Sequence, residues 1–167
     1  MINLQKPKPM SLKTVASGLS NKRRWCGLIP VSIAAHSVAV SVDLELMGYR
    51  PEIQLMGLLH DAPEAPLCDM PTSLKPFTFV QIDERLVSWS TLEDMWAEVL
   101  LPALGAGWPL PPEVKVSDRR AMSFEAFNWG LDVPRKFGEP SKGFSKQELS
   151  LLGKKDFINR YKELTNA

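Results

Sequence analysis

His60 and Asp61 adjoin one another, and Glu64 follows three residues later. Imidazole nitrogens and carboxylate oxygens are common ligands of divalent metals, and carboxylates also act as general acids and bases. The apolar run before them, residues 53–59, predicts a buried helix that ends at this point. Pro63 should break the helix, because it has no backbone N–H and its ring crowds the carbonyl four residues earlier. A break here lets the three side chains converge on one spot from two directions.

Both histidines of the chain, His36 and His60, fall in segments with helical periodicity. Apolar residues recur at spacings of three and four over residues 31–47, which predicts an amphipathic helix with His36 on its buried stripe and Gly48 as its stop. A single histidine on such a stripe is usually a hydrogen-bonded core residue. Two histidines on apolar helical faces favour a shared metal site instead.

Asp118 is the fourth candidate ligand. It lies in a helix predicted to begin at Pro112, four residues after Val114 and three before Ala121, and it therefore shares their inward-facing side. Taken alone, this pattern favours a surface aspartate screened by the two arginines that follow it. Together, two imidazoles with Asp61 and Asp118 would form a mixed nitrogen and oxygen site, with positions left for water and substrate.

Such a site has the chemistry of phosphoester cleavage. A divalent metal lowers the pKa of bound water, binds phosphoryl oxygens and neutralises the charge that develops during cleavage. Glu64 and Asp69 are not needed as ligands, so either can act as general acid or base on the attacking water or the leaving oxygen. Lys75 and Arg24 are available for the charge of the phosphate. The ligand types are compatible with Mn, Co, Fe, Zn or Mg.

The elements that must position these residues are predicted to be helical. The sequence has no alternating strand pattern of useful length, no internal repeat and no glycine-rich phosphate loop. A capping-box pattern at Ser145 and Glu148 opens the last predicted helix, which runs through Tyr161. The sequence therefore predicts an all-α protein. Besides the helices named above, its patterns predict an extended arm at residues 1–10, a helix beginning near Ser11, one helix over 79–101 and a proline-rich loop over 102–112.

Composition limits the class of protein. With 167 residues and 44% hydrophobic content, the chain predicts a single domain over residues 1–167 with its own core. A net charge of +1 gives no support to a nucleic-acid partner, and no apolar stretch approaches the roughly 20 residues of a membrane span. The N-terminus has no apolar signal core, and Cys26 and Cys68 fit a reducing compartment. We therefore expect a cytoplasmic protein.

The pattern resembles the HD-domain metal-dependent phosphohydrolases, in which a histidine is followed by a His-Asp pair and then by a distant aspartate. Within that family the resemblance is closer to the bacterial 5'-deoxynucleotidases and the small phage deoxynucleoside triphosphohydrolases. The matching blocks occur in order between residues 24 and 118: Arg24-Trp25, His36-Ser37, His60-Asp61-Ala62-Pro63-Glu64, Asp69-Met70-Pro71-Thr72 with Lys75, and Ser117-Asp118.

For the metal, the resemblance implies an HD-domain helical bundle in which His36, His60, Asp61 and Asp118 hold one divalent ion. It also implies that Glu64 takes part in catalysis.

For the substrate, the resemblance implies that Asp69 lies near the metal-bound water and that Arg24 binds the substrate. Trp25 resembles the aromatic residue that packs beside the sugar where a 2'-hydroxyl would lie. Without the resemblance, the segment around Trp25 fits a solvated turn with one anchoring aromatic residue. Lys75 belongs to the same matching block as Asp69, and the resemblance implies a homo-oligomer.

The sequence departs from the family in two places. The separation between the first histidine and the His-Asp pair is short, and the segment 66–68 between the two acids varies. After Asp118 the match extends only to helical character.

The expected function is hydrolysis of a 2'-deoxyribonucleoside 5'-monophosphate to a deoxynucleoside and phosphate. The alternative is a deoxynucleoside triphosphohydrolase, for example one that converts dATP to deoxyadenosine and triphosphate. Alarmone hydrolysis is disfavoured because those HD enzymes carry paired acids after the His-Asp motif, whereas Ala65 follows Glu64 here. A non-catalytic HD binding module is disfavoured because every motif position holds a chemically competent residue.

Overall fold

The computed structural model describes residues 5–132 and 138–166. Of the arm expected at residues 1–10, residues 1–4 lie outside the described part, and residues 5–10 form neither helix nor strand.

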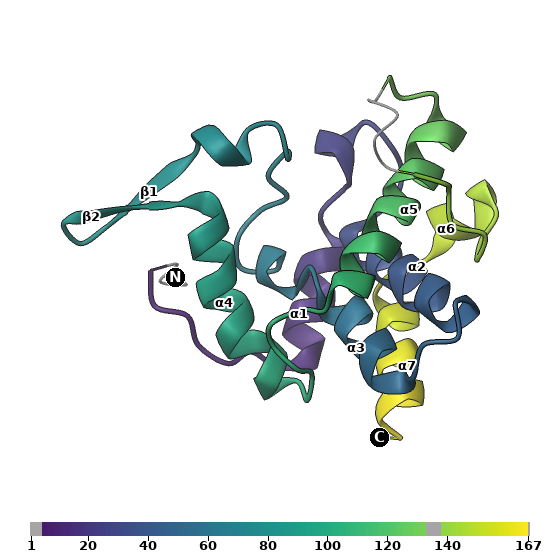
Figure 1. Ribbon diagram of the computed structural model, residues 1–167, viewed down its shortest axis with the longest axis horizontal. Coiled ribbons are helices and arrows are strands. Elements are labelled where there is room, and N and C mark those ends of the chain that lie inside the picture. Colours follow the sequence, from purple (N-terminus) through teal and green to yellow (C-terminus); the bar gives the residue numbers. More distant parts are fainter. Residues whose placement is uncertain (1–4, 133–137, 167) are drawn as a thin grey trace.

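The described residues are mostly helical, in agreement with the all-α prediction at the level of fold class (Figure 1). Seven α-helices, three short 3-10 helices and one two-stranded sheet make up their regular structure. In chain order they are α1 (Leu12–Ser20), η1 (Trp25–Gly27), α2 (Ile33–Leu46), α3 (Pro51–Leu59), η2 (Ala62–Glu64), η3 (Lys75–Phe77), β1 (Phe79–Ile82), β2 (Arg85–Ser88), α4 (Trp89–Ala103), α5 (Pro112–Trp129), α6 (Lys146–Leu151) and α7 (Lys154–Thr165).

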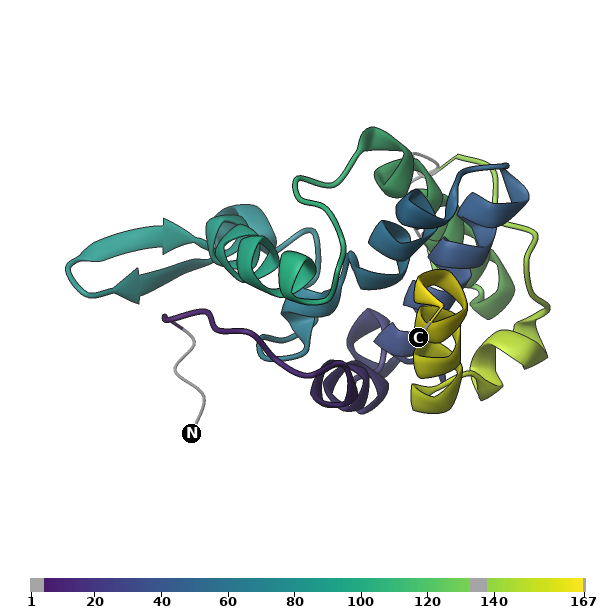
Figure 2. The same ribbon diagram turned by 90° about the horizontal axis from the view of Figure 1, so that it is seen from below.

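Helix α2 is the central element of the bundle. It begins after Ser32, whose hydroxyl accepts a hydrogen bond from the Ala35 N–H at 3.1 Å. Helices α1, α3, α5, α6 and α7 all pack against it, and α2 carries buried residues around nearly its whole circumference (Figures 1 and 2). The predicted single buried stripe was therefore too narrow. Alanines and serines at many α2 positions let neighbouring helices approach from several sides.

The prediction of one helix over 79–101 is wrong in its first part. Residues 79–88 form an antiparallel hairpin in which Phe79 pairs with Ser88 and Ile82 pairs with Arg85. The two-residue turn contains Asp83 at φ 53°, a left-handed conformation that such tight turns require. Helix α4 starts only at Trp89. The hairpin extends away from the helices (Figures 1 and 2).

The C-terminal region contains two helices where the sequence predicted one. The expected capping box is confirmed, because the Ser145 hydroxyl and the Glu148 carboxylate each accept the other residue's backbone N–H. Helix α6 then ends at Leu151. Gly153, whose N–H donates to the Asp156 carboxylate at 2.9 Å, starts α7.

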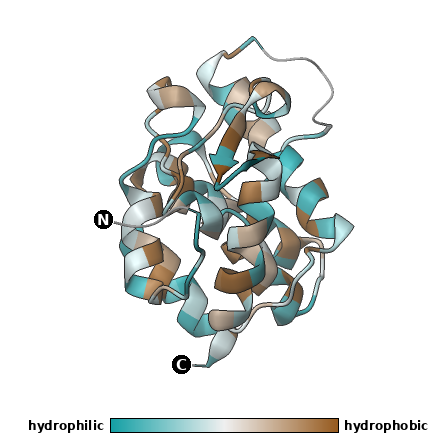
Figure 3. Cartoon of the chain, turned by 90° about the vertical axis from the view of Figure 1, so that its left-hand side faces the viewer, coloured by the Kyte–Doolittle hydropathy of each residue, from teal (hydrophilic) through white to brown (hydrophobic). Residues whose placement is uncertain are grey.

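The principal hydrophobic core joins helices from both halves of the chain. It contains Val15 of α1, Ile33 of α2, Leu58 of α3, Trp96 of α4 and Phe157 of α7. Most helices carry both hydrophobic and hydrophilic residues, as expected for helices that cover a common core (Figure 3). Among residues 5–132 and 138–166, no helix combines the length and the apolar character needed to cross a membrane.

Candidate metal centre

The helix break predicted at Pro63 is confirmed. Helix α3 ends at Leu59, His60 caps it, and Pro63 lies in the following 3-10 helix η2. The His60 ring turns back on its own helix, so that Nδ1 lies 2.7 Å from the carbonyl oxygen of Gly57. Because a carbonyl can only accept, Nδ1 carries the proton, and Nε2 is left with its lone pair for another partner.

His36, from the first turn of α2, is fully buried, and its Nδ1 is also held by a hydrogen bond. Its Nδ1 lies 2.7 Å from Oε1 of Glu125 on α5. This contact directs Nε2 at Asp118, whose Oδ1 accepts its hydrogen bond at 3.0 Å, and loss of that Nε2 proton would make the nitrogen a ligand atom. The two imidazole rings lie with their centroids 5.4 Å apart.

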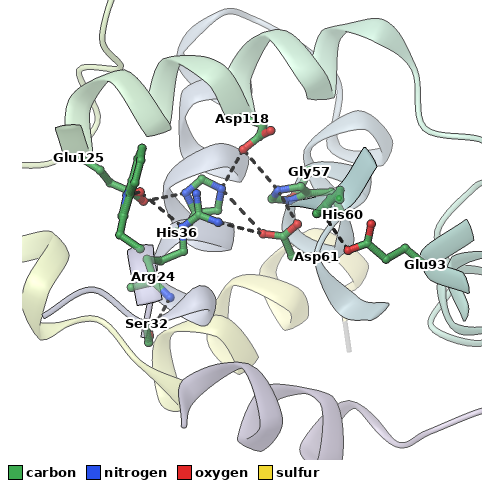
Figure 4. A network of polar contacts seen from close by, with 12 residues as sticks. Arg24, Ser32, His36, Gly57, His60, Asp61, Glu93, Asp118 and Glu125 are labelled. Atoms are coloured by element: carbon green, nitrogen blue, oxygen red, sulfur yellow. Dashed lines mark hydrogen bonds and ion pairs between the residues drawn. The ribbon is translucent and has the colours of Figure 1, made fainter. Parts of the chain in front are cut away.

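The two Nε2 atoms face the carboxylates of Asp61 and Asp118 (Figure 4). Oδ1 of Asp118 lies 3.0 Å from Nε2 of His36 and 3.8 Å from Nε2 of His60. Asp61 lies on the other side, with Oδ1 3.2 Å from Nε2 of His60 and Oδ2 3.8 Å from Nε2 of His36. His36, His60 and Asp118 therefore converge on one spot, and Asp61 lies beside both histidines.

The donor set fits a divalent cation. Two ligands that each lie about 2.1 Å from one ion are separated by at most about 4.2 Å, a limit that Oδ1 of Asp118 meets with Nε2 of both histidines. The ligand atoms of His36, His60 and Asp118 all lie within 4.8 Å of one another. Nε2 of His60 and Oδ2 of Asp61 are also buried without a hydrogen-bond partner among the described residues. Such orphaned atoms are costly unless a cation satisfies them.

Glu64 lies within η2, almost completely buried, with Oε2 lacking a hydrogen-bond partner in the described part of the chain. Burial and the negative charges of Asp61 and Asp69 raise its pKa well above the ordinary glutamate value. Asp69 is partly buried, and burial likewise raises its pKa, opposed by the charge of Arg24. The two acids assigned to proton transfer thus lie in the electrostatic field of the ligands.

Lys75 is already paired in this structure. Its Nζ lies 2.8 Å from Oε1 of Glu93 on α4, and the Trp89 indole N–H donates to the same oxygen at 2.9 Å. Burial lowers the pKa of Lys75, but the bond to Glu93 more than compensates and raises it. The structure therefore places Lys75 beside a carboxylate that sequence reasoning did not consider.

Glu125 is the main functional candidate that sequence reasoning missed. Its side chain is fully buried and contacts His36, Arg24 and Trp25. Burial alone raises the pKa of Glu125, but the positive charge of Arg24 and the contacts with His36 and Trp25 hold it below its usual range. One signal was present in the sequence: Glu125 follows Asp118 by seven residues, which places both on the same face of a helix two turns apart.

Arg24 lies between two of these carboxylates. Nε is 3.4 Å from Oε2 of Glu125, and Nη1 is 3.9 Å from Oδ2 of Asp61. Burial lowers the pKa of Arg24, but the surrounding acids, Glu125 first, raise it further and keep the guanidinium charged. The structure thus brings Arg24 next to Asp61, a proposed metal ligand.

Lys22 is a second residue that sequence reasoning passed over. Its ammonium donates to the backbone carbonyl of Glu64 and, at 2.8 Å each, to those of Ala65 and Leu67. Gly18, one turn earlier on α1, allows the close approach, because a Cβ there would lie 3.0 Å from Ala65. Helix α1 therefore fixes the turn that carries Glu64.

Comparison with known proteins places the chain in a family without assigning its activity. No family model matches the sequence. It is 31% identical over 157 residues to an uncharacterized protein of Rhodobacter capsulatus, an alignment that covers 83% of this chain and 76% of that protein. The chain belongs to the same family as the Rhodobacter protein. The function of this family must therefore be argued from the cluster itself.

Proposed function

We propose that this relative of the Rhodobacter capsulatus protein is an HD-domain phosphohydrolase. It would use one divalent metal to remove phosphate from a 2'-deoxyribonucleoside 5'-monophosphate. The observation that carries the proposal is the convergence of His36, His60 and Asp118 from α2, from the end of α3 and from α5, with Asp61 beside both histidines. When bound there, a divalent cation supplies Lewis-acid chemistry that increases the acidity of water and neutralises charge on phosphoryl oxygens.

Proton transfer is assigned to Glu64, with Asp69 as the second acid. A carboxyl whose pKa is raised by burial holds a proton closer to neutral pH, so it can protonate the leaving 5'-oxygen. The ionised form can accept a proton from the attacking water. The unpartnered Oε2 of Glu64 supports this role, because no protein group within the described residues competes for it.

The charges around the site favour a monophosphate over a triphosphate. Arg24 and Lys75, which the resemblance assigns to the substrate, each already face carboxylates: Arg24 faces Glu125 and Asp61, and Lys75 pairs with Glu93. The positive charge of these two side chains is therefore partly neutralised, which disfavours a longer polyphosphate because it carries more negative charge than a single phosphate group.

Trp25 supports discrimination against ribonucleotides. Its indole is half-buried, packs against the cluster formed around Ile29 and Val31, and is adjacent in sequence to Arg24. A 2'-hydroxyl pressed against such a ring would lose its hydrogen bonds to water. Leaving a hydroxyl unpaired costs about 1 to 3 kcal/mol, or roughly a 5- to 150-fold preference for the deoxy sugar.

A product assay tests the proposal. Purified protein is supplied with ribo- and deoxynucleoside mono- and triphosphates in the presence of Mn, Co or Mg, and the released product is identified as phosphate or triphosphate. We expect phosphate from deoxynucleoside monophosphates, and no turnover by Asp118→Asn. Release of triphosphate would transfer the assignment to a triphosphohydrolase. The absence of metal-dependent hydrolysis with every nucleotide would refute the proposal.

A further inference from the structure

Glu125 uses both oxygens of one carboxylate to hold residues with different proposed tasks. Oε1 accepts from Nδ1 of His36 at 2.7 Å. Oε2 accepts from the indole N–H of Trp25 at 2.7 Å and lies 3.4 Å from Nε of Arg24. Glu125 is fully buried, so water cannot replace it in any of these contacts. His36, a proposed metal ligand, and Arg24 both lie beside Glu125 in Figure 4, and the Trp25 indole shares the same partner.

For His36, the contact fixes which nitrogen faces the cluster. With Nδ1–H held by a carboxylate, the ring cannot flip, and Nε2 remains directed at Asp61 and Asp118. Carboxylates that bind the second nitrogen of a ligating histidine orient the ring and increase its basicity. Their loss typically weakens metal binding by about 10- to 100-fold.

For Trp25, the contact holds a backbone conformation that the sequence does not favour. Trp25 and Cys26 have φ values of 55° and 54°, so two consecutive residues with a Cβ lie in the left-handed region. Such residues persist only where surrounding contacts fix them. The indole N–H bond to Glu125 ties this turn to α5, and packing near Ile29 supports it from the other side.

We propose that Glu125 is a positioning residue that couples metal affinity to sugar discrimination, because it fixes the His36 ring and the Trp25 indole at the same time. The part of this inference that concerns the sugar rests on the proposed function, whereas the part that concerns the metal does not. Glu125 itself takes no proton from the substrate and contacts no reacting atom; it acts through the residues that it holds.

The test compares Glu125→Gln with the wild-type protein. Glutamine keeps the shape but removes the negative charge and turns an N–H-bearing end toward one donor, so one of His36 and Trp25 loses its acceptor and the other keeps only a weaker, neutral one. We expect Mn²⁺ affinity, measured by calorimetry without nucleotide, to fall by about 10- to 100-fold. At saturating Mn²⁺, the ratio of kcat/KM for dAMP to that for AMP should fall at least fivefold.

Asp43→Asn is the matched control. Asp43 is a second buried carboxylate between α2 and α5, where it accepts from Ser117 at 2.9 Å and from Arg120 at 2.9 Å. Its substitution should reduce stability to a similar extent, yet leave Mn²⁺ affinity and the dAMP to AMP ratio within twofold of wild type. A merely structural role for Glu125 predicts that both variants change Mn²⁺ affinity and the dAMP to AMP ratio to the same extent. That result would overturn the inference.

Trp25→Phe keeps the test decisive if Glu125→Gln does not fold. Phenylalanine retains an aromatic ring but lacks the N–H that Glu125 accepts. The ratio of kcat/KM for dAMP to that for AMP should therefore fall, while Mn²⁺ affinity stays within twofold of wild type. An unchanged ratio would overturn the coupling. If the wild-type protein cleaves no nucleotide, the proposed function fails, and Mn²⁺ affinity then decides alone: equal affinity of Glu125→Gln and wild type overturns the role of Glu125.

Discussion

The carbonyl oxygen of Gly57 accepts the Nδ1–H of His60 at 2.7 Å, and the same glycine faces α2. A Cβ on residue 57 would overlap Cδ1 of Leu44 and would lie 3.4 Å from Cγ1 of Val40. The missing side chain therefore lets α3 approach α2 closely enough for His60 to face His36. One glycine thus sets both the helix packing and the position of a proposed ligand.

Gly57→Ala should separate these helices. Overpacking a core costs about 1 to 3 kcal/mol, and alanine recovers up to about 1 kcal/mol through helix propensity. We expect a net loss of about 1 kcal/mol in the free energy of unfolding, measured with urea, together with weaker Mn²⁺ binding. Gly153→Ala, where a Cβ meets no atom within 4 Å, is the control. Tighter metal binding by Gly57→Ala would contradict this account of the site.

Metal binding should depend on His60 and Asp118. A ligand that binds only the native state stabilises it by about 2.7 kcal/mol at a concentration one hundred times its Kd. Increasing Mn²⁺ should therefore raise the Tm of the wild-type protein, measured by thermal unfolding. It should not raise the Tm of His60→Ala or Asp118→Asn. If His60→Ala retains full metal content and activity, the site lies elsewhere.

Glu64→Gln should separate catalysis from metal binding. The amide keeps the shape of the side chain and removes the titratable group, so metal content should persist. The kcat should fall by roughly 10²- to 10⁴-fold, the range typical of lost general acid or base catalysis. Loss of metal in this variant would make Glu64 a ligand instead, and an unchanged kcat would eliminate its catalytic role.

Lys22→Met should loosen the turn that carries Glu64 without touching the ligands. Methionine keeps much of the apolar stem but leaves the carbonyls of Glu64, Ala65 and Leu67 without their shared donor. We expect a loss of about 1 kcal/mol in unfolding free energy, since three part-buried carbonyl acceptors lose a charged donor. The kcat should also fall while Mn²⁺ affinity is retained. Lys22→Arg, which restores a donor, should recover part of both losses.

The part of the site that could be predicted is the part that local chemistry determines. Pro63 breaks a helix whatever surrounds it, so the exit of His60 and Asp61 could be located from neighbouring residues. The inward direction of Asp118 follows from its spacing to Val114 and Ala121, both buried.

The missed features depend on contacts between distant segments. Glu125 meets His36 and Trp25 across 89 and 100 positions of sequence, and no local pattern encodes such a pairing. The hairpin at 79–88 was read as helix because its apolar residues also fit helical spacing and continue into α4 without a break. Ser88, which caps α4 by accepting from the Thr91 N–H at 3.1 Å, marks the boundary that was overlooked.

Helix α7 provides none of the proposed ligands, yet it covers α2 and α3 and inserts Arg160 between Ser41, at 3.1 Å, and Gln54, at 2.7 Å. A ribosome delivers His36 and the later ligands well before it delivers α7. Until α7 is synthesised, the nascent chain therefore exposes the apolar surface of α2 and α3 that α7 covers in the folded protein. We expect the site to become rigid only once α7 has been synthesised and has docked on α2 and α3.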